Sequence, residues 1–208
     1  MRKRTRWSSP APLLADKRLY LVTPLRADFA EYLQAAITGG VDVVQVRERS
    51  ASDGRLLEML GKARGITRRL GVPFGVNDRP DLAILAEADF VHVGQDDIPV
   101  DAVRSFGLPV GLSTHAPREI DEAASDYIAV GPVHATPTKE GRPAVGLELV
   151  RYAAANAKLP WFAIGGIDAS NIRDVVAAGA TRVAVVRAIL EAEDPERAAR
   201  ELRDALPD

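Results

Sequence analysis

The chain has 208 residues, of which 47% are hydrophobic and 5% aromatic, and its formal net charge at pH 7 is −2. This length suits one domain and is too short for two well-filled ones, and the near-neutral charge excludes a bulk attraction to nucleic acid or to an anionic membrane. The chain has no cysteine, which excludes disulfides, thiolate metal sites and cysteine nucleophiles; a reducing cytoplasm is the simplest compartment to expect.

The first 17 residues differ in character from the rest of the chain. Arg2, Lys3, Arg4 and Arg6 make this segment basic, but no apolar signal-peptide core follows, because prolines interrupt residues 10–16. No apolar run approaches the ~20 residues of a membrane-spanning helix. We therefore expect residues 1–17 to be a flexible basic tail and residues 18–208 to form a single catalytic domain.

Short apolar runs alternate with Ala- and Leu-rich stretches over the remaining chain. Eight runs have the β-branched content of buried parallel strands, at 19–24, 41–48, 73–78, 90–94, 109–114, 127–133, 161–167 and 182–189. Helical spacing follows each of them, at 28–37, 52–70, 80–87, 100–106, 117–124, 147–157, 170–178 and 195–206. This alternation predicts an α/β fold, a single (β/α)₈ TIM barrel. A doubly wound sheet is the alternative, but no G-x-G-x-x-G follows the first strand.

The second expected strand carries polar side chains on one face. Gln45, Arg47 and Arg49 share that face by the two-residue period of a strand. Two charges at the end of a buried strand need a partner, and a negatively charged ligand would supply it. The alternative is that the arginines form ion pairs with Glu48 or with other carboxylates.

The third and fourth expected strands end in carboxylates. Asn77 and Asp78 close the third strand, and Gln95, Asp96 and Asp97 follow the fourth. Because active sites of these barrels lie at the carboxyl ends of the strands, the acidic groups would converge there. A few carboxylate oxygens together with ligand phosphate oxygens suit Mg²⁺. The alternative is that the aspartates cap the following helices.

Hydroxyl and ammonium groups follow the fifth and sixth expected strands. Ser113 ends the fifth strand, where its hydroxyl would either bond a ligand or cap a helix. The longest irregular stretch, 134–146, contains Thr136, Thr138 and Lys139. A loop of this length is more often functional than idle, and these side chains would suit an anion clamp, although a solvated loop would look similar.

The last two expected strands offer a second anion site. Gly165 and Gly166 end the seventh strand, and Val186 and Arg187 end the eighth. Paired glycines let a phosphate approach backbone N–H groups, and such barrels often bind phosphate between these two loops. A tight turn is the plainer interpretation of the glycines. Two neighbouring anion sites suggest a transferase that joins two phosphorylated small molecules.

Six short motifs at the ends of these strands resemble the thiamine-phosphate synthase family, with a match from Leu19 to about Arg200. They are Gln45-Val46-Arg47-Glu48-Arg49, Val76-Asn77-Asp78, His92-Val93-Gly94-Gln95-Asp96-Asp97, Gly111-Leu112-Ser113-Thr114-His115, Gly131-Pro132 with Thr136-Pro137-Thr138-Lys139, and Ala163-Ile164-Gly165-Gly166-Ile167. The resemblance implies a Mg²⁺-dependent transferase that joins hydroxymethylpyrimidine diphosphate to hydroxyethylthiazole phosphate and releases pyrophosphate. It implies small-molecule partners, without nucleic acid or membrane, and it leaves the formation of a homo-oligomer open.

The resemblance also implies roles for residues at matching positions. One Mg²⁺ per subunit would be bound by Asp78 and Asp97. The pyrimidine diphosphate would be held by Gln45, Arg47, Glu48, Arg49, Asn77, Ser113 and Lys139, and the catalytic charges would come from Arg47, Arg49 and Lys139. The thiazole phosphate would be held by Thr136, Pro137, Thr138, Gly166, Val186 and Arg187. The family usually has Lys at position 49 and often Ser at position 187, so Arg187 would bind through its backbone N–H or its guanidinium.

The chemistry that the resemblance implies needs no side-chain nucleophile. The aminopyrimidine pushes electrons toward the carbon that pyrophosphate leaves, so the protein would stabilise the departing charge and hold the thiazole nitrogen in line. Alternatives are a thiazole tautomerase-like barrel, which lacks the metal pair, and a non-catalytic barrel that binds thiamine phosphates. An unrelated phosphate-binding isomerase would need an acid–base pair, which the sequence does not offer.

Overall fold

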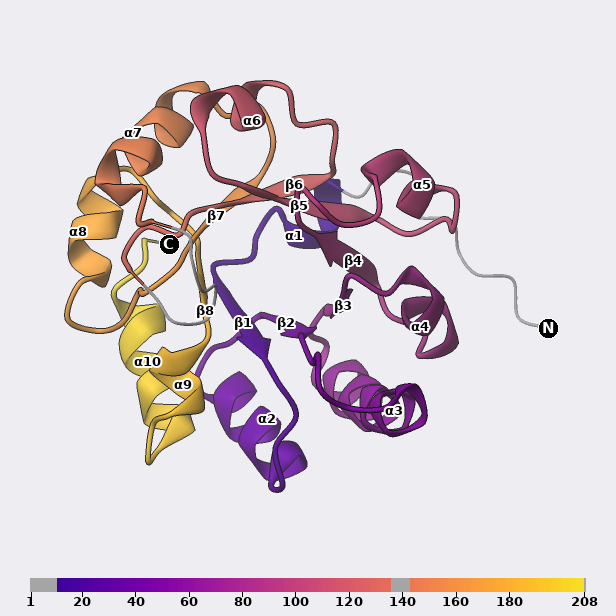
Figure 1. The fold of residues 1–208 in the computed structure, drawn as a ribbon. Coiled ribbons are helices and arrows are strands. Elements are labelled where there is room, and N and C mark those ends of the chain that lie inside the picture. Colours follow the sequence, from indigo (N-terminus) through magenta and orange to yellow (C-terminus); the bar gives the residue numbers. More distant parts are fainter. Residues whose placement is uncertain (1–10, 136–142, 208) are drawn as a thin grey trace.

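The structure is a computed structural model that describes residues 11–135 and 143–207. Eight parallel strands, each hydrogen-bonded to the next, close into a barrel in which β8 pairs with β1 (Figure 1). The strands are β1 (Leu19–Thr23), β2 (Val43–Val46), β3 (Phe74–Asn77), β4 (Phe90–Val93), β5 (Val110–Thr114), β6 (Tyr127–Val130), β7 (Trp161–Ile164) and β8 (Val183–Val185). The expected (β/α)₈ TIM barrel is therefore confirmed.

Helices connect the strands on the outside of the barrel (Figure 1). They are α2 (Phe29–Thr38), α3 (Asp53–Leu70), α4 (Pro80–Leu85), α5 (Val100–Arg104), α6 (Pro117–Asp121), α7 (Gly146–Asn156), α8 (Ile172–Ala177), α9 (Arg187–Leu190) and α10 (Pro195–Asp204), with α1 (Ala11–Leu14) ahead of the first strand. Within the described part of the chain, none of these helices combines the length and the apolarity that crossing a membrane requires.

The eighth strand is shorter than its apolar run suggested. We expected a strand over 182–189, but β8 ends at Val185 and a helical turn, α9, begins at Arg187. Val186 makes the change of direction, with φ −121° and ψ −83°. An apolar run does not distinguish a buried strand from a buried helical turn, which is why the sequence pattern runs across this boundary.

Aromatic rings fill the interior of the barrel toward the amino ends of the strands. Tyr20, Phe90, Tyr127 and Phe162 are at most 2% exposed and meet mainly edge to face, with ring centroids 5.2–6.2 Å apart. Glycines on neighbouring strands make room for two of the rings: a Cβ at Gly75 would lie 2.0 Å from Phe90, and Gly111 faces Tyr127 in the same way. The interior below the site is thus a packed core.

Helix α1 packs against this aromatic layer. Leu14 is 3% exposed and belongs to the same cluster of buried residues as Tyr20 and Phe162, and Leu13 packs against it. Arg182 donates a hydrogen bond to the carbonyl of Ala15 at 2.8 Å. The segment from residue 11, which we expected to belong to a loose tail, therefore includes a helical turn against the barrel, and residues 1–10 lie outside the described part.

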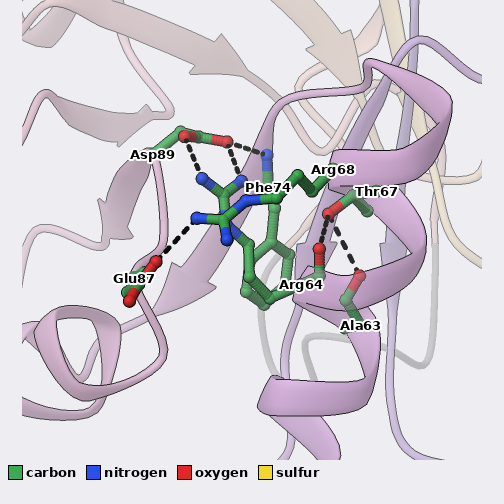
Figure 2. A network of polar contacts seen from close by, with 7 residues as sticks. All are labelled: Ala63, Arg64, Thr67, Arg68, Phe74, Glu87 and Asp89. Carbon is green, nitrogen blue, oxygen red and sulfur yellow. Dashed lines mark hydrogen bonds and ion pairs between the residues drawn. The ribbon is translucent and has the colours of Figure 1, made fainter.

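An aspartate before each of three even-numbered strands ties that strand to the one before it. Asp42 accepts the backbone N–H of Leu19 at 3.0 Å, Asp89 that of Phe74 at 2.9 Å, and Asp126 that of Val110 at 2.7 Å. Asp89 also accepts two hydrogen bonds from Arg64 of α3, at 2.8 and 3.1 Å, as Figure 2 shows. These contacts lie at the amino ends of the strands, where they stabilise the barrel away from the expected site.

Candidate active site

Two adjoining cavities lie at the carboxyl ends of the strands. The first, here the acidic cavity, has a volume of about 60 Å³ and is lined by Tyr20, Val22, Gln45, Arg47, Arg49, Asn77, Asp78, His92, Gly94, Asp97, Ser113, Ala129, Ile164 and Ala184. The second, here the glycine cavity, has a volume of about 210 Å³ and is lined by Val22, Arg47, His115, Gly131, Pro132, Ile164, Gly165, Gly166, Ile167, Asp168, Ala184, Val185, Val186, Arg187, Ala188 and Glu191. Four lining residues are common to both cavities, so they form two halves of one site.

Strand β2 supplies the polar groups between the two halves. Gln45 is 2% exposed at the floor of the acidic cavity, and Arg47, one step beyond the strand, lines both cavities. Burial, and next the charge of Arg49, lower the pKa of Arg47, while Asp78 and Asp97 act in the opposite direction. A half-buried cation without a hydrogen-bonded carboxylate among the described residues is suited to an anionic ligand.

The side chains of Arg49 and Glu48 have different partners. The guanidinium of Arg49 lies 3.4 Å from the carboxylate of Asp78, and its side chain is 66% exposed. Glu48 instead accepts backbone N–H groups from Arg49 and Ser50, at 2.8 and 2.7 Å, and from Leu25 at 3.3 Å. Burial raises the pKa of Glu48, but a hydrogen bond from the Ser50 hydroxyl, together with those from the backbone N–H groups, outweighs it and holds that pKa below its ordinary value. Glu48 lines neither cavity and holds together the loops that follow β1 and β2.

Asp78 and Asp97 form a pair of like charges. Burial, and next the negative charge of Asp97, raise the pKa of Asp78 from 3.8 to about 6. Asp78 has φ +60°, in the left-handed region that short polar residues tolerate, which turns its carboxylate toward the cavity that it lines. Asp97 accepts the N–H of Gly94 at 2.8 Å. Neither caps a helix, because α4 and α5 have Arg79 and Pro99 at their N-caps.

The oxygen groups of the acidic cavity fit a hard cation whose remaining coordination positions are filled by a ligand. Among the described residues no group of three or more His, Asp and Glu side chains is arranged to hold a metal ion. Two carboxylates are present, and Mg²⁺ is usually bound by one or two carboxylates with water and substrate phosphate oxygens rather than by a cage of protein groups. The pair therefore suits Mg²⁺ that arrives with a phosphorylated ligand.

The floor of the acidic cavity is a continuous set of hydrogen bonds. His92 of β4 is 7% exposed and contacts Tyr127 and Ser113, each at 3.0 Å. Gln45 contacts Asn77 at 2.6 Å and Tyr20 at 2.5 Å. The sequence interpretation missed Tyr20 and Tyr127, because a tyrosine in an apolar strand is indistinguishable from a packing residue.

The glycine cavity is built by the turn after β7 and the start of α9. Gly165 and Gly166 have φ +106° and +62°, and a Cβ on Gly166 would lie 2.7 Å from the Cβ of His134. Asn171 donates to the carbonyl of Gly166 at 2.8 Å and so fixes the turn. Val186 and Arg187 line the facing side. These glycines thus let the turn pack directly against Pro132 and His134, where a side chain would clash.

The other expected site residues lie outside the described part of the chain. Thr136, Pro137, Thr138 and Lys139 belong to the segment 136–142. The described residues ahead of that segment border the glycine cavity, since Gly131 and Pro132 line it. Of the other candidates, the structure brings Gln45, Arg47, Arg49, Asn77, Asp78, Asp97 and Ser113 together at one cavity, and Gly166, Val186 and Arg187 at the other.

The chain is similar in sequence and in fold to known thiamine-phosphate synthases. The model of a family described as thiamine monophosphate synthase matches residues 19–189. A thiamine-phosphate synthase of Arthrobacter sp. strain FB24 is 47% identical over 93% of this chain and 96% of its own. One from Thermus thermophilus is 50% identical over 91% and 97%. The solved thiamine phosphate pyrophosphorylase from Pyrococcus furiosus superposes with a TM-score of 0.84 at 32% identity, over 94% of this chain and 96% of that one.

Proposed function

The chain belongs to the thiamine monophosphate synthase family and has thiamine-phosphate synthase activity, that of a transferase, and we propose how its two cavities carry out that reaction. The pyrimidine diphosphate occupies the acidic cavity and the thiazole phosphate the glycine cavity. One observation supports this arrangement above the others: the cavities share Val22, Arg47, Ile164 and Ala184, so their occupants touch. A transferase needs two such adjoining compartments.

In the acidic cavity, each side chain has a part in binding the diphosphate half. Asp78 and Asp97 bind one Mg²⁺ per subunit, which neutralises charge on the pyrophosphate oxygens when it is bound. Arg47, Arg49 and Lys139 contribute positive charge, and Gln45, Asn77 and Ser113 contact the pyrimidine ring. Glu48 acts indirectly, because its carboxylate accepts the backbone N–H of Arg49 and so holds the backbone that carries Arg49.

In the glycine cavity, backbone groups carry the phosphate of the thiazole. Gly166 has no side chain to keep a phosphate from its backbone, Val186 lines the facing side of the cavity, and Arg187 stands at the start of α9. Thr136, Pro137 and Thr138, which lie outside the described residues, complete the set that we assign to this phosphate. Arg187 contributes its guanidinium or its backbone N–H, where relatives often have the hydroxyl of a serine.

The reaction needs positioning and charge stabilisation rather than proton transfer by a side chain. The bond between the pyrimidine methylene carbon and the pyrophosphate oxygen breaks, and its electrons leave with pyrophosphate. The thiazole nitrogen then supplies the electron pair of the new carbon–nitrogen bond. Arg47, Arg49 and Lys139 stabilise the negative charge that develops on the departing pyrophosphate. The proposal includes a cytoplasmic location and the two substrates as the enzyme's partners.

A turnover assay tests this assignment. Purified protein with both phosphorylated substrates and Mg²⁺ should release pyrophosphate and thiamine phosphate in equal amounts, and removal of the metal with a chelator should stop both. Arg47→Met should lower kcat/KM by at least about 100-fold, since a charge-assisted contact at the leaving group is lost. Arg200→Met removes an exposed arginine that pairs with Glu196 on α10 and should leave turnover unchanged. Equal activity in both variants would contradict the place we give to Arg47.

A further inference from the structure

Six side chains form one hydrogen-bonded chain across the floor of the acidic cavity. The contacts are Asn77 to Gln45 at 2.6 Å, Gln45 to Tyr20 at 2.5 Å, Tyr20 to Tyr127 at 3.0 Å, Tyr127 to His92 at 3.0 Å and His92 to Ser113 at 3.0 Å. The four inner members are between 1% and 7% exposed. Because water does not reach these groups, every proton in the chain has to point at a neighbour.

The direction of the chain is set at its glutamine. Gln45 donates through Nε2 to the carbonyl oxygen of Asn77, so its own oxygen faces the hydroxyl of Tyr20. A carbonyl oxygen has no proton, and Tyr20 must therefore donate to it. A hydroxyl has only one proton, so the contact between the two tyrosines is made by the proton of Tyr127.

The same assignment of donors and acceptors extends to His92. The proton of Tyr127 is engaged with Tyr20, and its oxygen accepts from Nδ1–H of His92. In a neutral imidazole that carries its proton on Nδ1, Nε2 is an acceptor. The hydroxyl of Ser113 therefore donates to His92 Nε2.

The two ends of the chain consequently face the cavity with opposite character. Ser113, whose proton is directed at His92, acts toward a ligand as an acceptor. Asn77, whose oxygen is used by Gln45, acts toward a ligand through its amide N–H groups. Both residues line the acidic cavity. An acceptor at one end and a donor at the other would both form hydrogen bonds with a ligand ring that carries an amino group beside an unprotonated ring nitrogen.

We propose that Tyr20, Tyr127 and His92 are positioning residues that fix this polarity, so that the site selects a 4-aminopyrimidine over a 4-oxopyrimidine. The inference rests on the proposed function for the identity of the ligand. An aminopyrimidine edge has an N–H donor and a nitrogen acceptor. The 4-oxo compound has a carbonyl acceptor and an N–H donor at the same positions, and it would set acceptor against acceptor and donor against donor.

The first test needs no substrate. The tautomer of His92 is read by ¹⁵N NMR of the imidazole nitrogens at pH 7.5, with the three histidines assigned by using His115→Gln and His134→Gln. A proton on Nδ1 and a bare Nε2 are expected. A proton on Nε2 would mean that the chain runs the other way, and it would overturn the proposal whether or not the enzyme makes thiamine phosphate.

The second test measures selectivity. The monophosphates of the amino and the oxo hydroxymethylpyrimidines lack a good leaving group, and their inhibition constants against the diphosphate give a ratio of affinities. For the unmodified enzyme this ratio should favour the amino compound by about 10–100-fold, the effect of a mismatched buried hydrogen bond. Tyr127→Phe removes the acceptor of His92 Nδ1–H, frees the imidazole to change tautomer, and should reduce the ratio at least about fivefold.

The control separates positioning from packing. Tyr32→Phe also deletes the hydroxyl of a tyrosine that is 2% exposed, but Tyr32 lies on α2, outside the chain. A purely structural effect of Tyr127→Phe would weaken both inhibitors alike and leave the ratio unchanged, which would overturn the proposal. Should Tyr127→Phe not fold, Tyr20→Phe interrupts the same chain and is read in the same way. An absence of turnover in the unmodified enzyme would instead contradict the proposed function.

Discussion

Replacing Asp78 by asparagine should make the metal-free protein more stable and the enzyme inactive. Asp78 is held beside Asp97 at the acidic cavity, and burial and that neighbouring charge raise its pKa from 3.8 to about 6. The folded protein therefore binds the Asp78 proton more tightly than the unfolded chain does. Stability falls as the pH rises from about 4 to about 6, because ionising Asp78 costs the folded state more than the unfolded one.

The size of this effect follows from the shift. A difference of about 2 pKa units corresponds to about 3 kcal/mol at pH values above both pKa values. The side chain of Asp78 is 23% exposed and faces Arg49 at 3.4 Å, and solvent screening reduces the figure to about 1–2 kcal/mol. An asparagine side chain cannot ionise, so Asp78→Asn should raise the free energy of unfolding by that amount at pH 7.5, and the melting temperature by about 2–8 °C.

The assay is chelator-treated unfolding of both proteins at pH 7.5 and at pH 4. The gain should be present at pH 7.5 and absent near pH 4, where Asp78 is protonated in the folded protein. Asparagine also suits φ +60°, but that contribution does not change with pH. Asp81→Asn is a control of opposite sign, because hydrogen bonds from Arg79 hold the pKa of Asp81 below its ordinary value. An equal gain at both pH values would refute the reasoning. With Mg²⁺, turnover should fall at least about 100-fold.

Four further substitutions test the barrel and the second half of the site. Asp89→Asn weakens the partly buried ion pair with Arg64 and should lower the free energy of unfolding in urea by about 2–3 kcal/mol, with kcat unchanged, because the pair lies at the far end of the barrel from the site; a lower kcat would contradict this. Gly75→Ala puts a Cβ 2.0 Å from Phe90 and should cost about 1–3 kcal/mol, whereas Gly65→Ala meets no atom within 4 Å in helix α3 and should stabilise by about 0.5–1 kcal/mol. Arg187→Ser should change KM for the thiazole phosphate by about 2–10-fold; a collapse of kcat alone would argue against a binding role.

The strand ends of the site could be predicted because parallel barrels impose a simple rule. Alternation of apolar runs with helical spacing predicted the barrel, and the barrel places the ends of all eight strands at one mouth. The two-residue period then put Gln45 and Arg47 on one face, and both line the acidic cavity. Asp78 and Asp97 follow neighbouring strands, so their approach also followed from chain order.

Other assignments depended on contacts that sequence spacing does not contain. Glu48 lies within the motif Gln45-Val46-Arg47-Glu48-Arg49, yet its carboxylate binds backbone N–H groups of the surrounding loops. The end of β8 at Val185 is decided by a turn at Val186, within a run that is apolar on both sides of it. In both cases a local pattern is compatible with two structures, and packing selects one.

By itself, the sequence determined the barrel, its family and the strand ends where charge gathers, because these depend on periodicities and motifs that are local in the chain. Only the tertiary structure joined Tyr20 of β1, Tyr127 of β6 and His92 of β4 into a directed set of hydrogen bonds. These residues are up to 107 positions apart. A hydroxyl or an imidazole acquires its direction from the neighbour that it meets in the barrel, and closure of the barrel decides which neighbour that is.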